Sequence, residues 1–166
     1  MIGIIGAMPQ ELEHIKTLVK NMKEQNIGVR TFYTGTIHQK EVVIVLAGIG
    51  KVNAAITTTL LIEHFNVSSI VNLGVAGGQN GVKHKDVVVS TEVLHHDVDV
   101  TAFGTYLHGQ VPGLNDHTFK ADKTLISKTT TILDHYNISY ITGRIASGDQ
   151  FITSTKKIAQ VNAIYT

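Results

Sequence analysis

The first twelve residues constrain the fold more than any other part of this chain. Residues 2–7 form a short apolar run, which is typical of a strand buried on both faces. The run turns at Gly6 and Ala7 into a segment with helical spacing, where Pro9 suits the first helical position. Glu11 then lies in the first helical turn, outside the carboxyl end of the strand. Ligands bind at this corner in α/β proteins, so an α/β fold with a functional site at this turn is predicted.

Strands and helices are predicted to alternate along the rest of the chain. The predicted strands are residues 29–37, 41–47, 69–75, 86–100 and 138–146, the first two forming a hairpin. The predicted helices are residues 9–22, with the apolar stripe Leu12, Ile15, Leu18, Val19 and Met22, then 52–65, a helix capped by Asp122, and 155–161. Residues 101–118 are predicted as a loop. No repeat or linker interrupts the pattern, so residues 1–166 are predicted to form a single domain.

Composition excludes several classes of protein. Hydrophobic residues make up 43% and charged residues 16% of the chain, which is typical of a globular core and not of a disordered segment. The net charge of +1 gives no electrostatic reason to expect nucleic acid or an anionic membrane as a partner. No apolar stretch reaches the ~18 residues that span a bilayer. Cysteine is absent, and we expect a cytoplasmic location.

Three glycine-containing junctions follow predicted strands, at residues 6–7, 48–50 and 74–78. Glycine permits positive φ and close approach of the backbone to a ligand, although ordinary strand-to-helix turns use glycine for the same reason. At one edge of one sheet the three junctions would form a single crevice. None matches a dinucleotide fingerprint or a phosphate-binding loop, so bound phosphate is not predicted.

Four segments in the same order carry a family resemblance. They are Gly3-Ile4-Ile5-Gly6-Ala7-Met8 with Glu11, residues 47–55, residues 96–104 and residues 147–152. Together they resemble the bacterial 5′-methylthioadenosine/S-adenosylhomocysteine nucleosidases of the nucleoside phosphorylase superfamily. The resemblance implies a three-layer α/β/α sandwich around a mixed central sheet, and a homodimer. It implies hydrolysis of the N-glycosidic bond of an adenine thio-nucleoside, releasing adenine and a thioribose, with no cofactor and no metal.

The resemblance also assigns roles to individual residues. Breaking the adenine–ribose bond needs an acid for the leaving base, a carboxylate that positions water, and hydrogen bonds to the sugar. Glu11 is implied as the water-activating carboxylate; taken alone, it is an ordinary first-turn glutamate favoured by the helix dipole. Phe151 is implied to stack on adenine, with Ile152 presenting backbone hydrogen bonds to the base. Taken alone, the two could equally be an apolar core pair.

Five further positions are implied to contact the substrate. Met8, Ile49 and Val100 resemble the lining of the alkylthio pocket, where a soft apolar wall suits a thioether. Phe103 and Pro112 resemble residues that reach into the partner's pocket across a dimer interface. Each of these five, taken alone, would be a plain core or loop residue.

The segment His95-His96-Asp97-Val98-Asp99 raises a metal-binding alternative. In a strand, His95, Asp97 and Asp99 would share one face, and imidazole and carboxylate groups can ligate metal. We favour the other interpretation, in which these polar groups form hydrogen bonds that brace the following loop.

The chain departs from the family pattern at two places. Val75 stands where the family has a hydroxyl residue facing the ribose, in the segment 72–78. The chain also ends before the family's Glu-Met-Glu segment and its Ser-Asp motif, which supply the glutamate for the ribose hydroxyls and the acid for adenine. By this comparison we expect a C-terminally truncated nucleosidase with impaired turnover. The alternatives are a non-catalytic remnant that binds a nucleoside or dimerises, and a phosphate-dependent purine nucleoside phosphorylase.

Overall fold

The computed structural model describes residues 1–79 and 81–165, with side chains described as far as residue 162. The described residues form two compact units, Met1–Val75 and the residues from Ala76 onwards, and each is described by itself. The predicted single domain over residues 1–166 stays a prediction.

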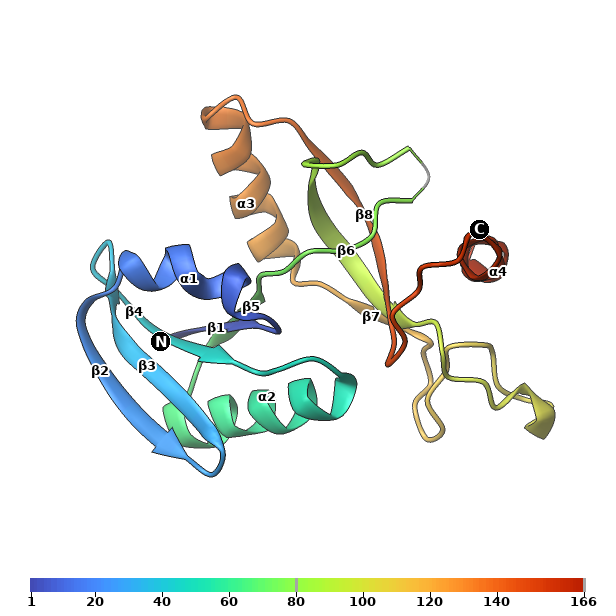
Figure 1. Cartoon of the computed structure of the whole chain (residues 1–166), viewed down its shortest axis with the longest axis horizontal. Coiled ribbons are helices and arrows are strands. Elements are labelled where there is room, and N and C mark those ends of the chain that lie inside the picture. Colours follow the sequence, from blue (N-terminus) through green and yellow to red (C-terminus); the bar gives the residue numbers. More distant parts are fainter. Residues whose placement is uncertain (80, 166) are drawn as a thin grey trace. The chain divides into compact units, whose positions relative to one another are not determined.

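The first unit is a five-stranded mixed sheet with two helices (Figure 1). Its elements are β1 (Ile2–Gly6), α1 (Pro9–Thr17), β2 (Lys20–Ile27), β3 (Arg30–Ile37), β4 (Lys40–Leu46), α2 (Lys51–Phe65) and β5 (Ser69–Asn72). The strand order is β2-β3-β4-β1-β5. β1 lies between β4 and β5 and is parallel to both, whereas β2, β3 and β4 are joined antiparallel.

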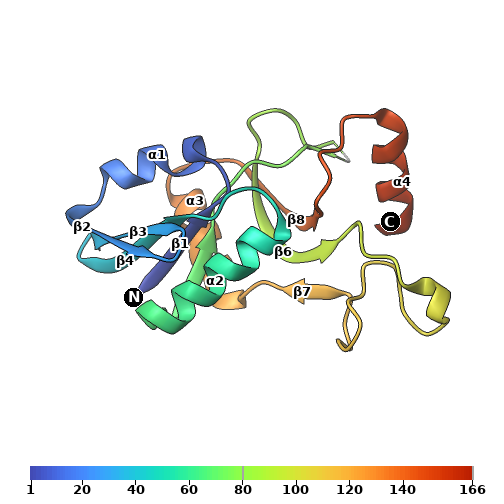
Figure 2. The same ribbon diagram turned by 60° about the horizontal axis from the view of Figure 1, so that its bottom comes forward.

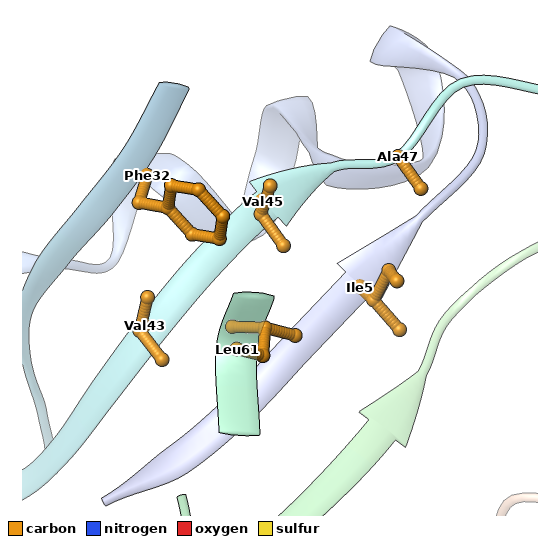
Figure 3. Close-up of a cluster of buried hydrophobic side chains, with 6 residues drawn as sticks. All are labelled: Ile5, Phe32, Val43, Val45, Ala47 and Leu61. Carbon is orange, nitrogen blue, oxygen red and sulfur yellow. The ribbon is translucent and has the colours of Figure 1, made fainter. Parts of the chain in front are cut away.

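Alternation along the strands places α1 and α2 on opposite faces of this sheet. Val43 and Val45 of β4 point to the face where Leu61 of α2 packs, as Figure 3 shows. Their neighbour Ile44 points to the other face, in a separate cluster with Leu12 of α1. Because both faces are covered by helices, the first unit is a three-layer α/β/α arrangement, which confirms the predicted fold class.

The hairpin of β3 and β4 is confirmed, and its two-residue turn has a clear local cause. His38 and Gln39 have φ of 45° and 65°, so both central residues adopt the left-handed conformation that hairpin turns favour.

The predicted helix over residues 9–22 is wrong beyond Thr17. Residues 20–27 form β2 instead, and Met22 of the predicted apolar stripe is 49% exposed on that strand. β2 carries seven exposed residues out of eight and is held by pairing with β3, so it has no buried face to produce a strand pattern in the sequence.

The carboxyl ends of β4, β1 and β5 meet at one edge of the first sheet, because the three strands are parallel neighbours. This edge brings together Gly6, the start of the 48–50 junction and Gly74, which confirms that these junctions share an edge within the first unit. α1 and α2 follow the adjacent strands β1 and β4 on opposite faces, the arrangement that places ligand sites in α/β sheets.

The second unit contains a three-stranded sheet in the order β7-β6-β8. Its elements are β6 (Val87–His95), the short 3-10 helix η1 (Thr101–Phe103), β7 (Thr118–Lys120), α3 (Lys123–His135), β8 (Tyr140–Ser147) and α4 (Thr155–Tyr165). The predicted N-cap is confirmed, since Asp122 Oδ1 accepts a hydrogen bond from the Leu125 N–H at 2.8 Å. Figure 2 shows the β6–β7 loop, with η1, extending away from the strands of this unit. None of the helices in the described residues combines the length and apolarity that a bilayer crossing demands.

Candidate active site

The carboxylate of Glu11 is held by three backbone N–H groups at the carboxyl edge of the first sheet. Its Oε2 accepts hydrogen bonds from the N–H groups of Ala7 and Met8, at 2.8 and 2.9 Å. Its Oε1 accepts a third, from the N–H of Val75, at 3.0 Å. The first two donors belong to the turn between β1 and α1, and the third lies just beyond β5. The side chain is therefore oriented by two segments that are 64 residues apart in the sequence.

The hydrogen bonds of Glu11 leave acceptor capacity at the site. A carboxylate offers about four lone-pair positions. The three described hydrogen bonds use two positions on Oε2 and one on Oε1, so a further position on Oε1 is available to a water molecule. This geometry goes beyond the first-turn glutamate of an ordinary helix, because the Val75 N–H lies outside the helix.

Gly74 is part of the same arrangement, because its Cα faces the Glu11 carboxylate. A Cβ built on Gly74 would lie 3.0 Å from Glu11 Oε1 and 3.4 Å from its Cδ. Both distances are tighter than most Cβ contacts, so a side chain here would press on the carboxylate. The sequence showed a glycine junction at this point but not its contact with Glu11.

The other predicted residues of the first unit lie at the same edge. Met8 is half-buried at the start of α1 and donates its N–H to Glu11. Ile49 lies between β4 and α2 with 74% of its surface exposed, and Val75 follows β5 with 78% exposed. Both exposures rule out a core position. Val75 donates its backbone N–H to Glu11, so this hydrogen bond does not depend on a side-chain hydroxyl at position 75.

The remaining predicted residues belong to the second unit. They are Val100, half-buried just before η1; Phe103, in η1 and 74% exposed; Pro112, exposed in the β6–β7 loop; Phe151, 94% exposed after β8; and half-buried Ile152. The core-pair alternative for Phe151 is wrong, because a core ring is not exposed to this extent. Their substrate roles stay predictions.

The acidic segment after β6 braces its loop, as we favoured over the metal-binding alternative. Asp97 Oδ2 accepts from the N–H of Asp149 at 2.8 Å, which joins this segment to the end of β8. Asp99 Oδ1 accepts from the N–H and the Oγ1 of Thr101, at 3.1 and 2.7 Å. The hydroxyl and then the backbone N–H of Thr101 lower the pKa of Asp99. β6 ends at His95, so Asp97 and Asp99 do not continue its face. Within the described part of the chain, no group of three or more His, Cys, Asp or Glu side chains could hold a metal ion.

A cavity of about 620 Å³ lies on the α1 face of the first unit, between α1 and strands β3 and β4. Glu13, Lys16 and Tyr33 are among its lining residues, and Lys16 Nζ lies 3.5 Å from the centroid of the Tyr33 ring. None of the predicted site residues lines it. The candidate active site is therefore the Glu11 edge and not this cavity.

Comparison with known proteins shows the family to which the chain belongs. The family model of the phosphorylase superfamily matches residues 1–165. A curated protein of Oceanobacillus iheyensis, named 5′-methylthioadenosine/S-adenosylhomocysteine nucleosidase, is 49% identical over 152 residues, which cover 91% of this chain and 66% of that protein. The nucleosidase of Staphylococcus epidermidis is 45% identical, covering 95% of this chain and 68% of that one. The chain belongs to this nucleosidase family. It spans about two thirds of the length of these curated relatives.

Solved structures of the family have the same fold. The nucleosidase of Neisseria meningitidis, in complex with methylthio-immucillin-A, matches with a TM-score of 0.94 at 38% identity, covering 99% of this chain and 71% of that chain. The nucleosidase of Colwellia psychrerythraea, in complex with adenine, matches with a TM-score of 0.92 at 41% identity, covering 99% and 68%. The family resemblance is therefore confirmed over almost the whole of this chain.

Proposed function

We propose that this chain carries the water-activating half of a 5′-methylthioadenosine/S-adenosylhomocysteine nucleosidase. The reaction is hydrolysis of the N-glycosidic bond, which releases adenine and a thioribose. The observation that carries the proposal is the carboxylate of Glu11, oriented by three N–H donors with an acceptor position left on Oε1. A water bound at that position would be deprotonated as it attacks the anomeric carbon. The cytoplasmic location stays a prediction.

The other residues divide between the sugar substituent and the base. Met8 and Ile49 at the Glu11 edge would form the wall for the 5′-alkylthio group, a role that the family pattern also gives to Val100, and Val75 would lie beside the ribose. Phe151 would stack on adenine and Ile152 would bond it through its backbone. The 94% exposure of Phe151 supports a ligand contact, because an exposed aromatic ring buries apolar surface when a flat base stacks on it.

We also propose that the chain pairs with a second copy of itself. α2 carries exposed apolar residues along the face away from the sheet, including Val52 at 69%, Ile56 at 49% and Ile62 at 50%. Val52 and Ile56 are four residues apart and lie one above the other, whereas Ile62 lies about 120° further around the helix. A partner of the same kind could cover this exposed apolar face of α2. Phe103 and Pro112 would then reach the partner's pocket, as the family pattern implies.

The test is adenine release from 5′-methylthioadenosine by the purified 166-residue chain, comparing Glu11→Gln with Glu13→Gln. The glutamine at position 11 would turn an NH₂ group toward one of the three N–H donors and remove the base. We expect its rate to fall by at least about 100-fold, the scale of a general base. Glu13 is exposed two residues along the same helix, so its variant should keep the rate of the parent chain.

Two other outcomes would change the conclusion. Binding of methylthioadenosine without adenine release would favour the non-catalytic nucleoside-binding remnant. A rate that rises with added phosphate would favour the phosphorolytic alternative.

A further inference from the structure

The loop at residues 48–50, between β4 and α2, has few stabilising contacts of its own. The Ala47 N–H donates to Gly6 O at 2.8 Å, and α2 begins with the Ala54 N–H donating to Gly50 O at 3.0 Å. Between these bonds lies Ile49, whose side chain is 74% exposed and so gains little fixation from packing. Gly48 and Gly50 flank it with φ of 83° and 104°, a region where glycine moves freely.

Asn53 holds this loop from the first turn of α2. Its Nδ2 donates to the carbonyl oxygen of Ile49 at 2.7 Å, and its Oδ1 accepts from Arg30 Nη2 at 2.6 Å. The amide NH₂ group thus has an acceptor and the amide oxygen has a donor, so an amide turned by 180° would lose both hydrogen bonds. The orientation of the Asn53 side chain is therefore fixed by Arg30 of β3 and by the backbone of Ile49.

Arg30 is in turn anchored in the core. Its Nε donates to Oγ1 of Thr57 at 3.1 Å, and Thr57 is a fully buried residue of α2. A Cβ on Gly48 would make only ordinary contacts with these groups, 3.5 Å from Asn53 Nδ2 and 4.0 Å from Arg30 Nη1, so the φ of 83° and not a lack of space favours glycine there. A continuous path of hydrogen bonds leads from buried Thr57 through Arg30 and Asn53 to the backbone of Ile49.

We propose that Arg30 and Asn53 form a strut that fixes the backbone of Ile49 at the Glu11 edge, which makes Asn53 a positioning residue for the group attached to C5′ of the nucleoside. The inference rests on the proposed function, in which Ile49 lines the wall for that group. The strut acts on the position of this wall and not on the chemistry at Glu11. It therefore affects the preference for a 5′-thioether nucleoside over a nucleoside without one.

Asn53→Asp separates this role from a contribution to stability. The aspartate keeps an acceptor for Arg30, now as an ion pair, and a carboxylate in the first turn of α2 is favoured by the helix dipole. The aspartate has no donor for Ile49 O, so the loop loses its hydrogen bond to residue 53. The contact between residue 53 and Arg30 remains. Thr59→Val is the matched control, because Thr59 Oγ1 also donates four residues back on α2, to Ala55 O at 2.9 Å, away from the loop.

The first measurement is the backbone ¹⁵N order parameters of residues 48–50 in the 166-residue chain. In Asn53→Asp we expect them to fall from about 0.85 toward 0.6 or below, with the urea midpoint unchanged or raised, whereas Thr59→Val keeps the parent values. Arg30→Met, which retains the stem of the side chain, should loosen the loop in the same direction. Unchanged order parameters in Asn53→Asp would overturn the strut.

The second measurement is the ratio of the affinities for 5′-methylthioadenosine and adenosine. We expect the ratio to fall by about tenfold in Asn53→Asp, the scale of one apolar contact, and to hold in Thr59→Val. An unchanged ratio in Asn53→Asp, with the parent chain binding both nucleosides, would overturn the positioning role and leave the proposed function intact. A parent chain that binds neither nucleoside would refute the proposed function, and the order parameters would still decide the strut.

Discussion

At the scale of single residues, the candidate site depends on backbone groups more than on side chains. The carboxylate of Glu11 is held by three donors, and all three are backbone N–H groups. Substitutions at its donors therefore act through conformation and space. This explains how Val75 can stand at a position where the family has a hydroxyl without loss of the bond to Glu11.

Gly74→Ala is expected to disturb the site with little damage to the fold. The new methyl group would press on Glu11 Oε1, 3.0 Å away, and displace the carboxylate or the Val75 N–H. We expect the affinity for methylthioadenosine to fall by about tenfold, because the displaced carboxylate no longer places a hydrogen-bonded water beside the bound nucleoside. Calorimetric titration measures it, and a urea titration should show the free energy of unfolding changed by less than about 1 kcal/mol.

Gly77→Ala is the control, because a Cβ at Gly77 meets nothing within 4 Å. It lies in the same glycine-containing junction and changes the same number of atoms. Equal affinities in the two alanine variants would argue against the role of Gly74.

At the scale of elements, burial explains several successes and failures of the sequence analysis. β1, β4 and α2 have buried faces and were predicted to within one or two residues. β2 and β7 are exposed edge strands that depend on pairing with β3 and β6, so no apolar period marked them. The position of Glu11 could be inferred from the turn chemistry of its own segment. Its bond to Val75 and the Arg30–Asn53 contact could not, because both depend on which strands pair.

The pairing of β6 with β8 is expected to depend on pH through one ion pair. Glu92 and Arg144 occupy facing positions on these strands, and Arg144 Nη2 and Nε lie 2.6 and 2.7 Å from Glu92 Oε1. The hydrogen bond from Arg144 is the largest cause lowering the pKa of Glu92 below 4.5. Because the folded-state pKa is the lower one, the stabilisation is complete above about pH 4.5 and is lost as pH falls through the folded-state pKa.

Urea titrations at pH 6 and pH 3 check this dependence in Arg144→Met and in the parent chain. We expect the parent chain to lose more stability on acidification than Arg144→Met. Lys128→Met removes another exposed cation, from α3, and should behave like the parent. An identical pH dependence in all three chains would contradict the assignment.

At the scale of the whole molecule, the 166 residues correspond to about two thirds of the curated nucleosidases they resemble. That portion includes Glu11, which we propose as the water-activating carboxylate, and the residues proposed above to contact the substrate. The proposed dimer can be tested independently of turnover.

Ile56→Glu is expected to shift the chain from dimer to monomer. Ile56 is 49% exposed on the apolar face of α2, and a carboxylate buried there at a two-fold interface would be close to its copy in the partner. Sedimentation velocity measures the shift. Val29→Glu places the same charge at an 87% exposed residue between β2 and β3, and should leave the assembly unchanged. A parent chain that sediments as a monomer would contradict the proposed dimer.

The bond between Glu11 and Val75 also sets an order of events during synthesis. Glu11 and two of its donors leave the ribosome early, but the third donor follows 64 residues later, together with the strand that completes the pairing of β1. At 5–20 residues per second, this interval is roughly 3–13 s. For that time a nascent chain carries the carboxylate without the geometry that orients it. The site therefore forms only when β5 joins the sheet, however early α1 folds.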